Sequence, residues 1–525
     1  MSGVGALEVV VALGAALVVA GIVARRVRIP PPVLLLVIGT ALGLAPALSA
    51  VRLPPEAVLL LFLPALLYWE SLTTSLREIR TNIRVIGLLS TALVVATAGG
   101  VAYVAHLLGV AWGPAWVLGA AVAPTDATAV SVLARGLPRR TTTVLRAESL
   151  VNDGTALAIF GLAMAVTIDG DELTTAKIGG LFALAYAGGV LAGLAAAWLA
   201  LTARRLIGDE PLLANTVSLL TPFLAFLLAE VVHASGVLAV VACGLVISQY
   251  GPRTISARTR TQAFAFWPLT TFVLNGALFV LIGMQLPDSV RGLHDGTLPH
   301  SAAVLAAVAA TVVGVRFAWS FTTPYLIRAL DRRPAQRLLR VGARARTISA
   351  IAGFRGAVSL AAALAVPSAV AERDLIVFVT SGVIVVTLGL GLFMPAVVRW
   401  ARLPDDDGPR QELLLAQTTA SQEALDALPG VGARLGVDDL VVARLRKEYE
   451  RHLSDLHTGD DDDGDRAEQT EHEQYTMLKL ELLAHKRATI VRLRDERRID
   501  DVVLRQLQGK LDIEEVRLTG TYTTE

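Results

Sequence analysis

The sequence predicts an all-α polytopic membrane protein with about thirteen transmembrane helices and a polar helical region at its C-terminal end. The first observation is composition: the chain is 54% hydrophobic, only 18% charged, and has a mean hydropathy of +0.58. Soluble domains carry about a quarter charged residues. The second is that residues 1–403 form apolar blocks of roughly 20 residues, the length that spans a bilayer. The third is that basic residues occupy alternate loops between these blocks.

The apolar blocks, taken in chain order, are the predicted spans. They cover residues 4–24, 31–46, 55–75, 85–108, 113–134, 144–168, 176–203, 211–232, 235–250, 263–286, 300–328, 346–367 and 373–399. The block 31–46 is short and begins within three consecutive prolines, so we expect a steep or partial span there. Among the boundaries between predicted spans, the one at His233 and Ala234 is the least marked in the sequence.

Arginines concentrate in every second loop. The arginine-rich loops contain Arg25, Arg26, Arg28, Arg77, Arg80, Arg84, Arg135, Arg139, Arg140, Arg204, Arg205, Arg253, Arg258, Arg260 and seven arginines from Arg328 to Arg346. The other loops hold only Arg52, Lys177, Arg291 and Arg373. Because loops rich in lysine and arginine stay in the cytoplasm, this pattern predicts an odd number of spans. We therefore expect a multi-pass protein of the plasma (inner) membrane, with its N-terminus outside and its C-terminal tail in the cytoplasm.

The composition changes at Pro404, which divides the chain into a transmembrane domain, 1–403, and a cytosolic helical tail, 404–525. In the tail we expect amphipathic helices at roughly 410–428, 437–457, 467–498 and 500–516, interrupted by a solvated acidic run from Asp460 to Asp465. A helical bundle or dimer contact is the simplest interpretation of the tail, and a regulatory role is the second. The single cysteine, Cys243, excludes disulfides within the chain.

Two stretches between Ala120 and Phe160 place carboxylates in apolar sequence. AAVAPTDATAV contains Asp126, and RAESLVNDGTALAIF contains Glu148 and Asp153. An ionisable side chain in a membrane-length apolar segment is costly and therefore indicates a functional site. Pro124 removes a backbone donor, so it predicts a helix broken within the membrane. A half-helix end beside a carboxylate is a recurrent ion site in secondary transporters. The alternative is that Asp126 simply caps the second half-helix.

The segment after the loop 135–143 brings further oxygen atoms to the same place. Residues four apart share a helix face, which pairs Ser149 with Asp153 and Glu148 with Asn152. Because the loop is short, this helix is the antiparallel neighbour of the Asp126 segment. A carboxylate in apolar surroundings beside another acid holds a proton more tightly than in water, so it can carry either a proton or a bare monovalent cation. The predicted cation and proton site comprises Asp153, Asp126, Thr125, Ser149 and Asn152. A structural ion pair is the alternative role for Asp153.

An arginine also lies inside an apolar segment, in AGFRGAVS, where glycines on both sides of Arg355 permit close helix approach. Because an unpaired buried arginine is costly, we expect Arg355 and Glu148 to form a structural ion pair. The alternative is that Arg355 balances the empty carboxylate site. Thr380–Gly382 is a candidate for a second broken helix. Glu70 is interpreted as interfacial, and Arg316 as capping or pairing locally.

Three motifs together resemble the monovalent cation/proton antiporter family, in its NhaP and Na⁺/H⁺ exchanger branch. They are APTD at 123–126, ESLVND at 148–153 and GFRGAVSL at 353–360, and FLPALLYWESLTTSLREIR at 62–80 is similar to the family's third-helix region. The resemblance covers about residues 1–400. It implies an NhaA-like antiporter fold with inverted repeats and crossed broken helices. It also implies a homodimer of thirteen-helix protomers, each with a core domain and a dimerisation domain.

The resemblance also implies roles for single residues. Asp153 matches the essential carboxylate that binds cation and proton in turn, and Asp126 with Thr125 matches the broken-helix residues beside it. The implied Na⁺ ligands are Asp153, Asp126, Thr125 and Ser149, and the implied stabilising ion pair is Glu148 with Arg355. Asn152 resembles the branch that exchanges one cation for one proton without net charge transfer. Ala127 and Thr128 depart from the proline or valine of many members, which leaves local geometry and cation selectivity open.

The expected function is therefore secondary antiport of a monovalent cation and H⁺ by alternating access, serving sodium transport and pH homeostasis. Na⁺ is the first candidate, with Li⁺ or K⁺ also accepted, and a K⁺-selective antiporter is the alternative. We expect no enzymatic activity and no cofactor; the partners are the cation, the proton, membrane lipid and a second protomer, and not nucleic acid. An intramembrane aspartyl protease would need a Gly-x-Gly-Asp context, and a cation channel would need a pore-lining filter; neither pattern is visible in the sequence.

Overall fold

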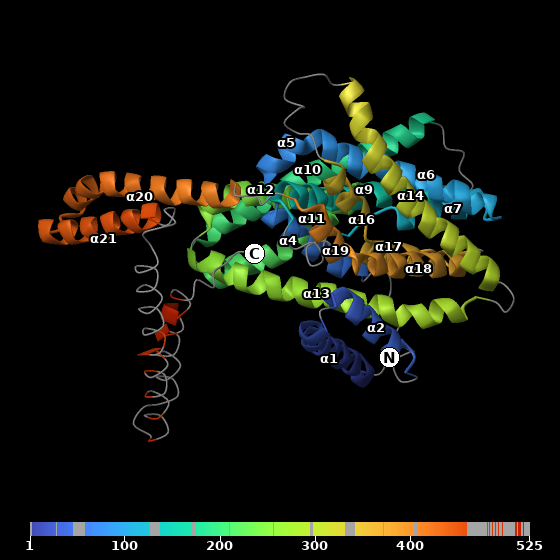
Figure 1. Cartoon of the computed structure of the whole chain (residues 1–525), viewed down its shortest axis with the longest axis horizontal. Coiled ribbons are helices and arrows are strands. Elements are labelled where there is room, and N and C mark those ends of the chain that lie inside the picture. The colour runs from blue at the N-terminus through green and yellow to red at the C-terminus, as the bar shows by residue number, and fades with distance from the viewer. Residues whose placement is uncertain are drawn as a thin grey trace. The chain divides into compact units, whose positions relative to one another are not determined.

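The computed structural model of the chain describes residues 3–27, 29–45, 58–126, 137–169, 175–208, 210–255, 257–293, 298–330, 342–370, 372–403 and 408–458, with scattered residues between 480 and 518. The chain divides into two compact units, Met1–Asp405 and Asp406–Glu525. All regular elements within the described ranges are helices, as Figure 1 shows. Each unit is considered by itself.

Eighteen helical elements are described in the first unit, and they follow the apolar blocks closely. The helices up to residue 169 are α1 (Gly3–Val27), α2 (Pro31–Gly43), η1 (Val58–Phe62), α4 (Leu63–Thr73), α5 (Leu76–Gly87), η2 (Leu88–Ala92), α6 (Leu93–Leu107), α7 (Trp112–Val122) and α9 (Arg139–Asp169). The two η elements are single turns of π-helix. Ser75 begins α5 as an N-cap, because its side chain accepts a hydrogen bond from the backbone N–H of Glu78.

The second half of the unit continues with long helices. They are α10 (Thr175–Ile207), α11 (Pro211–Val231), α12 (Gly236–Thr254), α13 (Ala257–Arg291), α14 (Leu298–Leu330), α16 (Ala343–Ile351), α17 (Ala357–Leu364), α18 (Arg373–Gly391) and α19 (Met394–Ala401). Each predicted apolar block contains at least one helix of the unit. Within the described residues, eight helices are long and apolar enough to cross a membrane, and shorter apolar helices include Trp112–Val122 and Gly236–Gly251. The protein is a multi-pass membrane protein.

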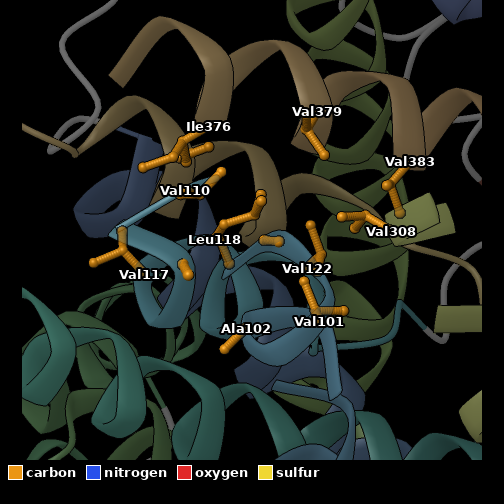
Figure 2. Close-up of a cluster of buried hydrophobic side chains, with 14 of the residues drawn as sticks. Val101, Ala102, Val110, Val117, Leu118, Val122, Val308, Ile376, Val379 and Val383 are labelled. Carbon is orange, nitrogen blue, oxygen red and sulfur yellow. The ribbon is translucent and has the colours of Figure 1, made fainter. Parts of the chain in front are cut away.

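One buried apolar cluster joins α6, α7, α14, α17 and α18. Figure 2 shows its centre, where Ile376, Val379 and Val383 of α18 lie opposite Leu118 and Val122 of α7. Valine and alanine dominate this cluster, and such small side chains allow helices to pack closely in a membrane. The cluster therefore holds α7, which leads to Asp126, against α18.

A second buried cluster joins α4, α10, α11, α12 and α13. The helix α9 lies between the two clusters, because it contributes Ala163 to the first and Leu150 to the second. A third cluster packs α2 against α13. There, a Cβ on Gly283 would overlap the backbone carbonyl of Leu36, so glycine is required for this close approach.

The second unit contains two antiparallel helices that pack against each other, α20 (Gly408–Leu435) and α21 (Asp439–Thr458). Gly436, with a φ of +65°, allows the chain to turn between them. The side chain of Asp438 begins α21 by accepting a hydrogen bond from the backbone N–H of Leu440 at 2.8 Å. These helices correspond to the first two expected in the tail. The acidic run from Asp460 and most of the two later expected helices lie outside the described residues.

Candidate functional site

Two interrupted helices meet in the first unit. The helix α7 ends at Val122, and residues 123–126 are not helical, as Pro124 predicts. The helices α16 and α17 are separated by residues 352–356. The backbone N–H of Asp126 donates to the carbonyl of Phe354 at 2.8 Å, so the two interruptions are joined directly. Backbone groups freed from helices thus satisfy each other inside the protein.

The second interruption is not at Thr380–Gly382, where the sequence suggested it. Those residues lie inside α18, which is a continuous helix. The helix breaks instead at Gly353 and Gly356, since glycine is a poor helix former. The hydroxyl of Thr387 on α18 accepts a hydrogen bond from the backbone N–H of Arg355 at 3.2 Å, which satisfies one of the donors released by the break.

Gly356 touches Asp126. A Cβ at this position would overlap the Asp126 carboxylate and would lie 2.7 Å from its Cγ. Any residue with a Cβ atom would fill part of the space that the carboxylate occupies, so the position requires glycine. The glycine of one interrupted helix therefore determines where the acid of the other can lie.

Thr125 is held by α9 through two hydrogen bonds. The side-chain amide of Asn152 donates to the Thr125 hydroxyl at 2.6 Å, and the Ser149 hydroxyl donates to the Thr125 carbonyl at 2.9 Å. The spacing of Ser149 and Asn152 places both on the face of α9 that meets the interrupted helix. The structure thus brings together the two segments that the sequence predicted to be neighbours.

Asp153 lies on the same helix and is 5% exposed. It is close enough to Asp126 and Glu70 for their charges to interact. The side-chain oxygen of Asn152 is buried and accepts no hydrogen bond from any described residue. The charges of these three carboxylates interact beside the oxygens of Asn152, Ser149 and Thr125, although no three acidic side chains of the described residues form a ready-made metal-ion cluster. An all-oxygen environment of this kind suits a hard cation.

Glu70 is the site residue that the sequence interpretation missed. It lies on α4, and its charge interacts with those of Asp126 and Arg146. Its position near the end of an apolar block suggested an interfacial glutamate. The rule that selected Asp126, an acid within a membrane-length apolar segment, also applies to Glu70 and would have found it.

Glu148 pairs with Arg316, and not with Arg355 as the sequence suggested. Its Oε1 lies 2.6 Å from Nη1 of Arg316, and its Oε2 lies 3.2 Å from Nη2. The Arg316 Nε donates to the carbonyl of Ser349 at 3.0 Å. Both side chains are almost fully buried, at 1% and 3% exposure. A bidentate pair satisfies both carboxylate oxygens, which a buried carboxylate requires. The expectation that Arg316 pairs only locally is also wrong.

Arg355 is satisfied by backbone carbonyls at the two interruptions. Its Nε donates to the carbonyl of Val122, the last residue of α7, at 3.0 Å, and its Nη1 donates to the carbonyl of Gly353. The carbonyl end of a helix carries partial negative charge, so the end of α7 and a carbonyl of the second interruption can together hold the guanidinium without a carboxylate. This explains why the predicted pair with Glu148 does not form. Arg355 instead links the two interrupted helices.

The family profile described as "Sodium/hydrogen exchanger, transmembrane" matches residues 13–400. The chain belongs to the sodium/hydrogen exchanger family. An uncharacterized Na⁺/H⁺ exchanger of Mycobacterium tuberculosis is 46% identical over 99% of this chain and 97% of its own length. The low-affinity Na⁺/H⁺ antiporter NhaS1 of Synechocystis is 29% identical over 77% of each chain.

This exchanger also has the fold of a solved family structure. The sodium proton antiporter MjNhaP1 from Methanocaldococcus jannaschii aligns with a TM-score of 0.59, covering 77% of this chain and 99% of that one at 18% identity. The all-helical arrangement of the described residues therefore matches an antiporter fold. The sequence-based assignment to the NhaP and Na⁺/H⁺ exchanger branch is confirmed.

Proposed function

We propose that this protein is a secondary antiporter that exchanges Na⁺ for H⁺ across the plasma membrane, with Asp153 binding the two ions in competition. The observation that carries the proposal is the position of Asp153, buried on α9 beside Asp126 and Glu70 where two interrupted helices meet. The names of relatives that are Na⁺/H⁺ antiporters support the same activity. The family consists of transporters, so no chemical reaction is involved.

The competition between Na⁺ and H⁺ follows from the negative charge of the Asp153 carboxylate. A buried carboxylate is costly unless a proton or a cation neutralises it, and either one suffices. When Na⁺ is bound, its ligands in the proposal are Asp153, Asp126, Thr125 and Ser149, with Asn152 and Glu70 as further oxygen donors. When the proton is bound, Asp153 is neutral and the cation leaves. Alternating access then carries each form across the membrane in turn.

Alternating access also requires a particular arrangement of the chain in the membrane. We place thirteen spans in the membrane domain 1–403, arranged as inverted repeats, and assign the tail 404–525 to the cytoplasm as a helical and possibly regulatory domain. The arginine-rich loops support this orientation, with the N-terminus outside. The long exposed apolar faces of α1 and α10, which include Val18 and Leu191, are consistent with lipid contact and a homodimer.

The direct test uses purified protein in proteoliposomes with an acidic interior and a pH-sensitive dye. Addition of Na⁺ outside is expected to move protons out of the liposomes, since cation entry is coupled to proton exit. The same assay with Li⁺ and K⁺ determines selectivity. Proton movement with K⁺ alone would replace Na⁺ by K⁺ in the proposal, and cation flux with no proton movement would refute antiport.

Exchange is expected to be electroneutral. Asn152 stands directly before Asp153, as in the branch of the family that exchanges one cation for one proton. Clamping the membrane potential of the liposomes with valinomycin and K⁺ should therefore leave the Na⁺-driven rate unchanged. A rate that changes with the imposed potential would show that net charge moves in each cycle.

Substitution of Gly356 by alanine is expected to weaken Na⁺ binding. The added Cβ would occupy the space of the Asp126 carboxylate, so Asp126 must move away from the site. We expect the KM for Na⁺ in the proteoliposome assay to rise about tenfold. The matched control is Gly389→Ala on α18, where a Cβ would meet no atom within 4 Å. An unchanged KM in Gly356→Ala would remove Asp126 from the cation site.

A further inference from the structure

The helix α10 ends with two arginines in opposite environments. Arg205 is exposed, whereas Arg204 keeps only 8% of its surface accessible. Arg204 continues the helix face of Ala197 and Ala200, which is buried in the cluster of α4 and α10–α13. Arginines near the end of a membrane helix ordinarily extend toward the headgroups. Arg204 instead directs its charge into the protein.

Arg204 lacks a counter-charge in the described part of the chain. Its Nε and Nη1 atoms are buried and donate no hydrogen bond to any described residue, and no described carboxylate forms an ion pair with it. A buried guanidinium with unused N–H groups is costly. Some group outside the described protein atoms must therefore offset the charge.

The polar neighbours of Arg204 are also donors. The Tyr68 hydroxyl is fully buried and lies near Arg204 and Ser218, but it makes no well-formed hydrogen bond with either of them or with another described residue. Trp267 donates its indole N–H to the Ser218 hydroxyl at 3.3 Å, and its ring packs against Tyr68 with centroids 5.5 Å apart. Each of these side chains carries an N–H or O–H group, and none carries a negative charge.

We propose that Arg204, Tyr68 and Ser218 form a binding site for a small monovalent inorganic anion such as chloride. An anion provides both the missing charge and the missing hydrogen-bond acceptor, whereas water provides only the acceptor. The site lies among α4, α10 and α11, and none of its three residues belongs to the proposed cation site. By the predicted orientation, it is near the cytoplasmic ends of these helices.

The test measures thermal unfolding of the full-length protein in detergent while chloride replaces gluconate at constant Na⁺ and ionic strength. A ligand that binds only the folded state raises Tm, so we expect a saturable rise of about 5 °C. Arg204→Gln should lose the rise. The matched control, Arg205→Gln, should retain it, because Arg205 is exposed on the same helix. Equal Tm values in chloride and gluconate for the unaltered protein would overturn the proposal.

Two milder variants keep the test decisive if Arg204→Gln does not fold. Tyr68→Phe and Ser218→Ala each remove one hydroxyl, and each should shift the chloride midpoint at least threefold higher. Unchanged midpoints in both would also overturn the proposal, as would an equal loss of the chloride response in Arg205→Gln, which indicates surface screening. None of these results depends on antiport, so failure here is separate from failure of the proposed exchange.

Discussion

The variant Asp153→Asn is expected to lose all cation-driven proton exchange, with a proteoliposome signal equal to that of liposomes without protein. Asparagine has nearly the same shape but neither binds a proton near neutral pH nor offers a negative charge to Na⁺. Because the proposed mechanism uses one carboxylate for both ions, no partial activity should remain. Exchange at the normal rate in Asp153→Asn would refute the assignment.

Two controls separate a loss of ion binding in Asp153→Asn from a loss of folding. Asp153→Asn should unfold at a temperature no lower than the unaltered protein, since it removes a buried charge that repels Asp126 and Glu70. Asp288→Asn removes a partly exposed carboxylate paired with Arg291 at 3.2 Å, and it should keep full exchange. A strongly lowered Tm for Asp153→Asn would mean that Asp153 is structural.

The second large effect is expected at the buried pair of Glu148 and Arg316. Glu148→Gln leaves the Arg316 guanidinium buried without its counter-charge, which costs about 3–5 kcal/mol of folding stability. Thermal and denaturant unfolding in detergent measure this loss. The matched control is Asp374→Asn, which breaks an exposed pair with Arg373 and should cost less than about 1 kcal/mol.

A double-mutant cycle identifies the partner of Glu148. Glu148→Gln combined with Arg316→Gln should be less destabilising than the sum of the two single changes, because neither charge is then left alone. Combination with Arg355→Gln should be closer to additive, since Arg355 is held by the backbone carbonyls of Val122 and Gly353. A larger coupling to Arg355 than to Arg316 would restore the pairing suggested by the sequence.

Much of the site is predictable because it is local in the sequence. Thr125 lies 24 and 27 positions from Ser149 and Asn152, on segments joined by one short loop. Helix periodicity and the antiparallel connection are enough to bring these residues together. Pro124 predicts the interruption of α7 for an equally local reason, the missing backbone donor.

The residues that were misassigned depend on distant parts of the chain. Glu148 and Arg316 are 168 positions apart, and no loop length or periodicity relates them. Arg355 was expected to need a carboxylate because the sequence does not show that backbone carbonyls of two interrupted helices surround it. Glu70 looked interfacial because its neighbours across α4 cannot be read from its own segment.

The sequence by itself determined that this is a membrane protein, where its apolar segments lie, and that acids and a proline-broken helix form a candidate ion site, because these follow from composition, periodicity and covalent geometry. The tertiary structure alone decided which arginine neutralises Glu148, where the second helix is interrupted, and that Glu70 joins Asp126 and Asp153. The physical reason is that a buried charge is satisfied by whatever packing brings near it, and packing in a helical membrane protein joins residues far apart in the chain.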